Sequence, residues 1–485
     1  MVTADEFIQT YSQALSDRNA AVLVGAGLSI PAGLVNWKEL MRSIAAEIEL
    51  DVEKESDLVA LAQYHLNERG GRQRINQTLV TEFSERADIT ENHRILARLP
   101  IETFWTTNYD HLIEEALRES GKRADIKITA ENLATTLPRR DAVVYKMHGD
   151  VSDPANAVIT KDDYESYGCT RRGQLFSTAL RGDLVSKTFL CLGFSFSDPN
   201  LDYILGRIRI LLEGNRREHY CLMRTVQRRD FKNVRDFQYA RTKQELQIRD
   251  LRRYGIMGVM LDNFDQYTQT LKNLERRYRA RQIFISGSAA TYAPWSENES
   301  HRFLALLGKR LTESGMNVIT GFGLGVGPHV INGVLDELEK EGTRNLSERL
   351  TLRPFPFAIT DPEKRKKRWT SYRQDMVSRA GVAVFVFGNR ADPSGKILPA
   401  DGMFEEFEIA CRSGLLVAPV GATGYVAKCL HQKVSEDFQS YFPDMRGLKA
   451  ALGALGREGT PSDIAERVFK FISIATVGNR DVGAK

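Results

Sequence analysis

The feature that most constrains the fold is a repeated pattern in which a short apolar run ends in glycine or small polar residues. Residues 21–24 (AVLV) form the first such run, and Gly25, Ala26 and Gly27 follow it. An apolar run of this length that stops at a glycine turn is typical of a buried parallel strand. Glycines at that point let backbone amides approach an anion such as a pyrophosphate, because no Cβ intervenes. The sequence therefore predicts an α/β fold with a ligand site at the end of its first strand.

The segment after this turn predicts helices rather than a second strand. Asn36 is the expected N-cap of the next helix, since Glu39 follows three residues later and completes a capping box, and the free amides of that helix are expected to face the same anion. The pattern then stays mostly helical to about Leu99. Ile30 stands where the dinucleotide fingerprint G-x-G-x-x-G needs its third glycine, and no second strand with a ribose-binding acid follows. A hydride-transfer enzyme is therefore disfavoured. The glycine turn by itself fits equally well with a structural turn that binds nothing.

Three further predicted strands also end in polar residues. Strands are expected over residues 103–107, 143–145 and 188–192. Open α/β sheets build their ligand sites at the carboxyl ends of the strands, so the residues that follow these strands are expected to share one site. Those residues are Asn108, Tyr109 and Asp110 after the first, His148 and Gly149 after the second, and Gly193 and Ser195 after the third.

Four motifs together resemble the NAD-binding motifs of the sirtuin superfamily. They are GAGLS (25–29), TTNYD (106–110), HGD (148–150) and GFSFSDPN (193–200), and the resemblance covers about the first 280 residues. It implies a sirtuin-like, Rossmann-type parallel sheet domain with a helical insertion over residues 1–281, with NAD⁺ as substrate. It also places Asn108 and Asp110 beside the scissile bond and the nicotinamide amide, and His148 beside the ribose hydroxyls. The substrate-binding residues that it implies around the phosphates and the adenosine side are Gly25, Ala26, Gly27, Ser29, Gly193 and Ser195.

The chemistry implied by the resemblance suits a sparse site. Nicotinamide leaves from a cation as a neutral molecule, so the leaving group needs no general acid. We expect Asn108 to orient water and the ribose, Asp110 to accept from the carboxamide, and His148 to polarise ribose hydroxyls or to act as base. An isolated histidine is more often a satisfied buried residue. The adjacent Gly149 and Asp150 and the two companion motifs favour a catalytic role for Asn108 and His148 instead.

Two departures separate the chain from the deacylase branch of that superfamily. The nearest pair of cysteines, Cys411 and Cys429, is eighteen positions apart, so no C-x-x-C zinc pair can be written and we expect neither zinc nor another metal. Residues 31–35 (PAGLV) replace the arginine-bearing loop of the deacylases. Both departures favour water over an acyl-lysine as the nucleophile. An NAD-dependent protein deacylase and a non-catalytic nucleotide-binding scaffold remain as alternative functions.

A second α/β unit is predicted to begin after a boundary near Ala280. It opens with IFISGS (283–288) and continues with a helix over 296–314, a strand over 317–320, the turn GFGLGVG (321–327) and a helix near 328–341. Further strands are expected at 351–357, 382–387 and 415–420. ISGS, GFGLGVG, VFVFGNR and DGMFEEFEIA resemble the SLOG nucleotide-sensor family, which implies a second Rossmann-like domain over residues 282–485 that binds rather than catalyses.

Candidate ligand residues in this half are Arg373, Arg390 and Glu405, together with Gly287 and Ser288 after the first strand. A guanidinium clamps phosphates in bidentate fashion, and a carboxylate at a helix start can hold ribose hydroxyls. The alternative for each charged residue is a surface ion pair, and the sequence does not choose between Glu405 and Glu406. The segment EKRKKRW (363–369) is expected to be an exposed basic loop, with its Trp369 either anchoring that loop or packed in the core.

A sirtuin-like half fused to a SLOG half resembles the NAD-consuming effectors of Thoeris antiphage defence. The resemblance implies that a TIR-domain partner makes a cyclic ADP-ribose isomer, that the SLOG half binds this isomer, and that the sirtuin-like half then depletes NAD⁺ to abort infection. It also implies a homotetramer or a larger assembly. Differential affinity for an active arrangement, worth about 1 to 3 kcal/mol in typical cases, would couple the two halves.

Composition agrees with a protein of two domains. The 485 residues are 42% hydrophobic and carry a formal net charge of +4, which argues against obligatory nucleic-acid binding although residues 224–281 concentrate arginine. The five cysteines show no pairing pattern, which favours a reducing compartment. Neither a signal peptide nor an apolar run of membrane-spanning length is present. We therefore expect a cytoplasmic protein with no membrane contact.

Overall fold

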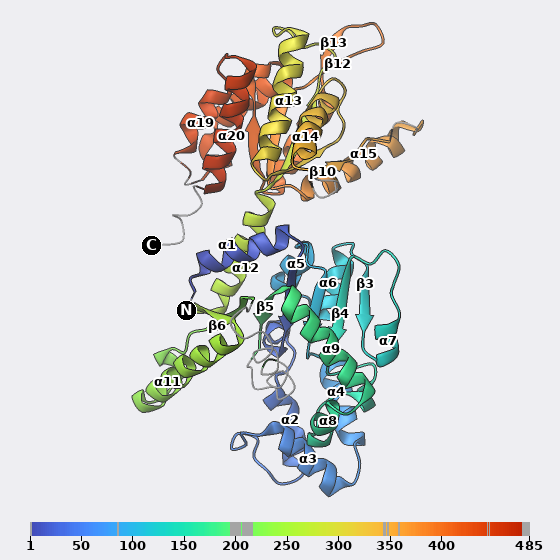
Figure 1. Ribbon diagram of the computed structural model, residues 1–485, viewed down its shortest axis with the longest axis vertical. Coiled ribbons are helices and arrows are strands. Elements are labelled where there is room, and N and C mark those ends of the chain that lie inside the picture. Colours follow the sequence, from blue (N-terminus) through green and yellow to red (C-terminus); the bar gives the residue numbers. More distant parts are fainter. Residues whose placement is uncertain are drawn as a thin grey trace. The chain divides into compact units, whose positions relative to one another are not determined.

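The computed structural model describes residues 2–84, 87–194, 205, 217–342, 346, 349–356, 359–443, 445 and 447–477. The chain forms two compact units, Met1–Glu275 and Arg276–Lys485, each built on a parallel sheet (Figure 1). The division falls inside helix α12 (Phe264–Arg279), whereas the sequence pattern places the boundary a few residues further on, after Arg281. The predicted α/β class, with one parallel sheet after another along the chain, is confirmed.

The first unit contains a seven-stranded sheet in the order β3-β4-β2-β1-β5-β6-β7, parallel throughout. The central strand β1 is fully buried and lies between β2 and β5. Chain connections depart in opposite directions from this point, so the loops after β1, β2 and β5 border one crevice. The strand bounds are β1 Ala20–Val24, β2 Thr103–Thr106, β3 Ala124–Lys127, β4 Ala142–Lys146, β5 Thr188–Leu192, β6 His219–Arg224 and β7 Ile256–Leu261.

Sequence patterning located four of these strands and missed three. Strands β1, β2, β4 and β5 stand where the apolar runs predict them. Strand β7 (IMGVML) pairs with β6 inside the arginine-rich range 224–281, where no strand is expected from the sequence. Arginines on both sides of this short run dominate the local pattern and conceal it.

A group of helices after β1 forms the predicted helical insertion. α2 (Trp37–Ala46) begins with the expected capping box, in which the Asn36 side chain accepts from the Glu39 amide at 3.0 Å. Together with α3 and α4 it surrounds a separate apolar core, and these helices lie at one end of the sheet (Figure 1). The other helices of this unit surround the sheet. The bounds of the insertion helices α3 and α4 and of these other helices are α1 Ala4–Ser16, α3 Leu58–Arg69, α4 Gln73–Ser84, α5 Glu91–Arg98, α6 Leu112–Glu119, α7 Ala130–Ala134, α8 Lys161–Tyr167, α9 Arg171–Ser186 and α11 Val234–Leu251.

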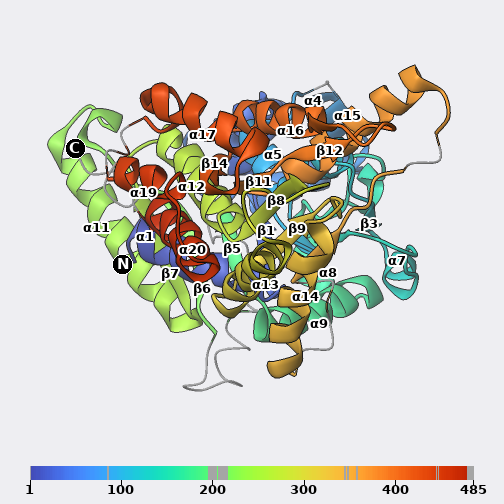
Figure 2. The ribbon, with the colours of Figure 1, turned by 90° about the horizontal axis from the view of Figure 1, so that it is seen from above.

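The second unit contains a five-stranded parallel sheet in the order β10-β9-β8-β11-β14. Its first strand, β8 (Gln282–Ser288), lies between β9 (Asn317–Thr320) and β11 (Val382–Phe387), so a second crevice is expected where these three strands end. Figure 2 shows α13 (Glu297–Glu313) and α14 (Gly327–Lys340) on one side of β8 and β11, and α16 (Asp401–Arg412) on the other. The remaining elements are β10 Leu350–Leu352, β12 Asn389–Ala391, β13 Ile397–Pro399, β14 Leu416–Pro419, α15 Pro362–Ser378, α17 Tyr425–Glu436, α18 Phe438–Tyr441, α19 Leu448–Leu455 and α20 Pro461–Val477.

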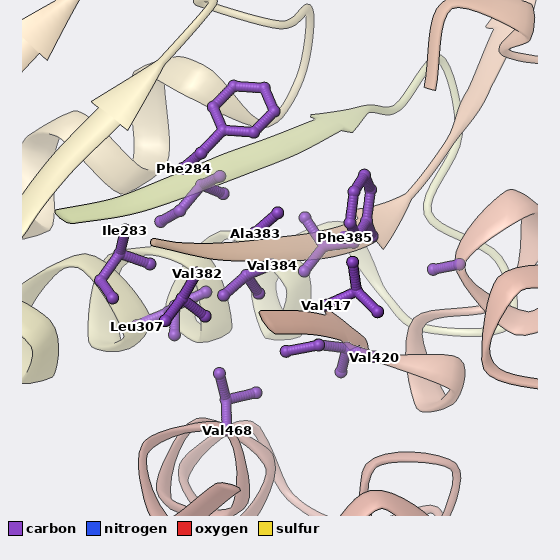
Figure 3. Close-up of a cluster of buried hydrophobic side chains, with 14 of the residues drawn as sticks. Ile283, Phe284, Leu307, Val382, Ala383, Val384, Phe385, Val417, Val420 and Val468 are labelled. Atoms are coloured by element: carbon purple, nitrogen blue, oxygen red, sulfur yellow. The ribbon is translucent and has the colours of Figure 1, made fainter. Parts of the chain in front are cut away.

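The core of the second unit is a continuous apolar layer along β8, β11 and β14. Figure 3 shows Val382, Val384 and Val417 among the side chains between these strands and the helices, with Leu307 and Val468 reaching them from α13 and α20. All five are almost fully buried. Burying an aliphatic side chain of this size stabilises a fold by about 1.5 to 3 kcal/mol. This layer fixes the strand ends that carry the candidate ligand residues.

Two expectations for the second unit are wrong in detail. The strand expected over 351–357 is short, because β10 ends at Leu352. The basic segment 363–369 lies on a helix, α15, rather than in a loop. Asp361 caps that helix and Pro362 occupies its first turn, and lysine and arginine are good helix formers. Trp369 anchors the segment, since its indole N–H donates to the Pro356 carbonyl at 3.0 Å.

Candidate functional site

A cavity of about 840 Å³ opens at the carboxyl ends of β1, β2 and β5. Its volume lies in the range of small-molecule and cofactor sites, about 300 to 1,000 Å³. Three strand ends and the helical insertion supply its lining, as the switch-point argument predicts. The strand ends contribute Gly25, Ala26, Gly27, Ser29, Thr107, Asn108, Tyr109, Asp110, Gly193 and Phe194, and the helices contribute among others Asn36, Trp37, Lys38, Leu58, Tyr164 and Glu165.

The glycine turn after β1 packs directly against the turn after β5. The amide of Gly25 donates to Leu192 O at 2.9 Å, and the amide of Gly27 donates to Gly193 O at 3.0 Å. A Cβ on Gly27 would lie 2.7 Å from the Gly193 Cα. The glycines are therefore required first for this close approach of two backbones. Their own amides are taken by carbonyls, although both residues line the cavity.

We expect Gly27→Ala to push the two turns apart. The added methyl cannot be relieved by a side-chain rotation, because the obstructing atoms are backbone, so unfolding free energy should fall by about 2 to 4 kcal/mol. Gly182→Ala is the matched control, since a Cβ there meets nothing within 4 Å on helix α9 and should leave stability equal or higher. Thermal denaturation of both variants checks this. Equal melting temperatures for Gly27→Ala and Gly182→Ala would contradict it.

Asn108, Ser29 and Asp110 form a buried hydrogen-bonded chain on the cavity wall. Asn108 Nδ2 donates to Gly25 O at 3.2 Å and to Ser29 Oγ at 3.0 Å, and Ser29 Oγ donates to Asp110 Oδ2 at 2.8 Å. Asp110 Oδ1 accepts from the amide of Leu112 at 3.1 Å. Because Nδ2 is committed to two oxygens, Oδ1 is the atom of Asn108 that can accept from a water or a ribose hydroxyl. The chain fixes that atom in place.

His148 lies one side chain away from the cavity. It is 1% exposed and is not among the residues that line the cavity. Its ring packs edge-on against Tyr164, with ring centroids 5.5 Å apart, and Tyr164 lines the cavity. A second tyrosine, Tyr167, packs on it at 6.3 Å. His148 therefore contacts the lining of the cavity through the Tyr164 ring.

This arrangement predicts the chemical accessibility of His148. Tyr164→Ala should speed modification of His148 by diethyl pyrocarbonate by about tenfold or more, because it removes the cavity-lining ring that packs against the imidazole. Tyr164→Phe is the matched control, since it keeps the ring and should leave the rate unchanged. Mass spectrometry of the peptide that carries His148 gives the rate. Equal rates in all three proteins would show that Tyr164 does not cover the histidine.

Ser195 lies outside the described residues, so of the predicted substrate residues the cavity holds Gly25, Ala26, Gly27, Ser29, Asp110 and Gly193. Sequence reasoning missed Tyr164, which stands on α8 and has no motif of its own. It also gave no role to Lys146, although this residue lies two positions before the HGD motif (148–150). A fully buried lysine at a strand end is visible only once the strand bounds are known.

In the second unit, Arg373 is held between two acids of α16. Its guanidinium pairs with Glu405 at 2.7 Å and with Glu406 at 3.3 Å, and it lies over the Phe355 ring at 5.0 Å. Burial raises the pKa of Glu406, which also accepts from Ser286 at 2.6 Å. The side chain of Glu405 is 31% exposed against 11% for Glu406. Both carboxylates therefore pair with Arg373, and Glu405 is the more exposed of the two.

The other sensor candidates lie at the end of β8 and on β12, the short strand that follows β11. Gly287 packs so closely that a Cβ would lie 2.6 Å from Val386 O, and Ser288 Oγ donates to Asn389 O at 3.0 Å. Arg390 is half-exposed and pairs with Asp401 at 3.2 Å, which is the surface ion pair weighed as its alternative. Sequence reasoning missed Asn389, which is fully buried and accepts from the amides of Ala290 and Thr291.

Within the part of the chain that the structure describes, no three histidine, cysteine, aspartate or glutamate side chains gather as a metal site. The described helices also include none with the length and apolar character needed to cross a lipid bilayer.

The two units correspond to two known domain families. Residues 102–249 match the model of a SIR2-like domain, and residues 266–475 match the model of the Sir2- and TIR-associating SLOG family. The class defined by fold and site is therefore a sirtuin-like domain followed by a SLOG domain.

The chain also matches relatives over nearly their whole length. The chain is 48% identical over 473 residues to the NAD(+) hydrolase ThsA of Bacillus cereus strain MSX-D12, covering 96% of this chain and 98% of that relative. It is 44% identical over 475 residues to the NAD(+) hydrolase ThsA of Enterococcus faecium, covering 96% and 97%. A shorter match, 26% identical over 207 residues, covers 40% of this chain and 20% of defense-associated sirtuin 2 of Bacillus subtilis. The chain belongs to the ThsA family.

Proposed function

We propose that this protein hydrolyses the nicotinamide–ribose bond of NAD⁺ and releases nicotinamide and ADP-ribose. The observation that carries the proposal is the cavity, which Asn108 and Asp110 line beside the glycine turn of β1. Relatives of this chain in the same family are named NAD(+) hydrolases. The volume of the cavity is adequate for a dinucleotide. NAD⁺ is the substrate, and the reaction uses no cofactor and no zinc.

The roles of the residues follow from which atoms are committed and which remain. Asn108 Oδ1 accepts from the attacking water or a ribose hydroxyl, while Ser29 and Asp110 keep its amide fixed. Asp110 also accepts from the carboxamide of nicotinamide. His148 polarises a ribose hydroxyl or takes the proton of water once Tyr164 has moved aside. A positioned base is worth about 10²- to 10⁴-fold in rate, or roughly 3 to 5 kcal/mol.

The second unit is proposed to sense a cyclic ADP-ribose isomer made by a TIR-domain partner. The matched SLOG family is described as associating with Sir2 and TIR domains, which supports such a partner. Arg373 would bind phosphate oxygens of the isomer and Glu405 its ribose hydroxyls, while Gly287, Ser288 and Arg390 stand on the neighbouring strand ends. The isomer activates only if it binds the active arrangement better than the resting one.

In the cell, we propose an effector of Thoeris antiphage defence that acts in the cytoplasm. Depletion of NAD⁺ would stop an infected cell from supporting phage. A match to a protein named defense-associated sirtuin supports a defence role. The active form is proposed to be a homotetramer or a larger assembly, and light scattering after size exclusion, with and without the isomer, tests this.

One assay separates this function from its competitors. Purified protein is incubated with NAD⁺ alone, with each cyclic ADP-ribose isomer, and with an acylated peptide, and nicotinamide and its companion product are measured. The proposal predicts release without peptide, stimulated by an isomer, with ADP-ribose as the product. Release only with peptide, together with O-acyl-ADP-ribose, would identify a deacylase. Binding of NAD⁺ without any release would identify a scaffold.

A further inference from the structure

Lys146 connects the two segments that carry Asn108 and His148. It is the last residue of β4, and its side chain is fully buried. Its ammonium donates to two backbone carbonyls of the loop after β2, Tyr109 O at 3.2 Å and Asp110 O at 2.5 Å. It therefore bonds the backbone directly after Asn108, while belonging to the segment that leads into His148.

The same ammonium stands at the centre of a charged cluster. Glu114 on α6 lies 3.1 Å from Nζ, and Asp150, two residues after His148, lies closer still. Asp150 also pairs with Nε2 of His111 at 2.9 Å. With His111 protonated, the cluster contains two cations and two carboxylates. We call Lys146, Glu114, Asp150 and His111 the Lys146 cluster.

The cluster keeps Lys146 charged in spite of its burial. Burial by itself would lower the pKa of Lys146, but Glu114 and Asp150 outweigh it, and the pKa is raised overall. Burial would likewise raise the pKa of Asp150, yet hydrogen bonds from His111 and Lys146 hold it far below its ordinary value. Buried ion pairs seldom stabilise a fold more than apolar residues of the same size do. Both carbonyls that the Lys146 ammonium contacts belong to the loop after β2. The ammonium is therefore placed to hold that loop in position.

We propose that Lys146 is a positioning residue for NAD⁺ hydrolysis, whose ammonium holds the 108–110 loop and the 148–150 turn in a fixed relation. The inference rests on the proposed function. Its physical basis is that the reacting groups must be held in a near-attack arrangement, where a misplacement of about 1 Å can cost roughly 10²-fold in rate. His111, which is 48% exposed, connects the cluster to solvent.

The first test removes the ammonium and keeps the stem. Lys146→Met should lower kcat for nicotinamide release by about 10²-fold and change KM by less than about threefold, because the substrate-binding turns of β1 and β5 are untouched. Lys127→Met is the matched control. Lys127 is an equally buried lysine at the end of neighbouring β3, paired with Asp125 at 2.9 Å and bonded to the carbonyl of Thr135, but touching neither segment. It should lose stability without losing kcat.

The second test uses pH and a residue whose replacement leaves the core intact. His111 faces Asp150, Lys146 and Glu114, and the hydrogen bond with Asp150 raises its pKa above the ordinary value of about 6.5. A group whose pKa is higher in the folded than in the unfolded state stabilises the fold at pH values below its unfolded-state pKa. That contribution is lost as pH rises through its folded-state pKa. Because the cluster loses one positive charge when His111 deprotonates, kcat of the wild type should fall severalfold as pH rises through the folded-state pKa of His111. His111→Gln should abolish this alkaline decline.

The outcomes separate this inference from the proposed function. Absence of nicotinamide release by the stimulated wild type at every pH would remove the proposed function. If the wild type is active and Lys146→Met matches Lys127→Met in kcat, the inference is overturned while the function stands. Should Lys146→Met fail to fold, the pH profiles decide, and an alkaline decline retained unchanged in His111→Gln overturns the inference.

Discussion

Asn108→Ala should lower kcat/KM for NAD⁺ hydrolysis by about 10²- to 10³-fold, the range seen when one fixed polar group at a reacting centre is removed. The change removes Oδ1, the acceptor that the hydrogen bonds of Nδ2 hold in the cavity. It also leaves Ser29 and Gly25 O without one partner, so unfolding free energy should fall by about 1 to 3 kcal/mol. Nicotinamide release and thermal denaturation measure the two effects separately.

Asn67→Ala is the control for this result. Asn67 stands on α3 of the same unit, accepts from Gln63 at 2.9 Å and does not line the cavity. Its replacement should leave kcat/KM within about twofold. An Asn108→Ala enzyme that retained wild-type kcat/KM would remove Asn108 from the mechanism.

Arg373→Ala should greatly weaken stimulation by a cyclic ADP-ribose isomer while leaving the cavity of the first unit unchanged. Loss of a guanidinium that clamps a phosphate should shift the half-maximal isomer concentration by about 10²-fold, or roughly 3 kcal/mol. The variant also leaves buried Glu406 without its cation, which should destabilise the second unit by about 3 to 5 kcal/mol. Dose–response curves and thermal denaturation give the two quantities.

Two companion variants make this result interpretable. Glu405→Ala keeps the Arg373–Glu406 pair, so it should weaken the response to the isomer with little loss of stability. Arg379→Ala removes only a half-exposed ion pair with Asp375 at the end of α15. It should change neither the response to the isomer nor the stability. If Arg373→Ala still responds normally at low isomer concentration, the ligand binds elsewhere.

Apolar periodicity and capping predicted the elements that place the cavity. β1, β2, β4 and β5 were readable because each is a short apolar run that stops at a polar or glycine residue. The capping box of α2 was readable because it depends on two side chains three positions apart. β6 and β7 could not be predicted in this way, because the arginine-rich segments beside them mask short apolar runs. The local sequence pattern thus locates strands in which an apolar run changes abruptly to polar or glycine residues.

Side-chain placement within the site was less accessible to sequence reasoning. The packing of His148 against Tyr164 depends on how α8 packs, and no spacing in the chain encodes that contact. Glu405 and Glu406 differ only by one helical step of about 100°, and only the packing of α16 shows which carboxylate faces inward. The Lys146 cluster joins residues from β4, α6 and two loops, so it appears only after the sheet is assembled.

The central claim is that Asn108 and His148, from the ends of two neighbouring strands, act on the same bond. A double-mutant cycle measures this most directly, with nicotinamide release determined for the wild type, Asn108→Ala, His148→Ala and the combined variant. Groups that act as a unit give strongly non-additive losses. The account predicts that each single variant loses at least about 10²-fold and that the combined variant is little slower than the slower single. Wild-type release by either single variant would contradict it.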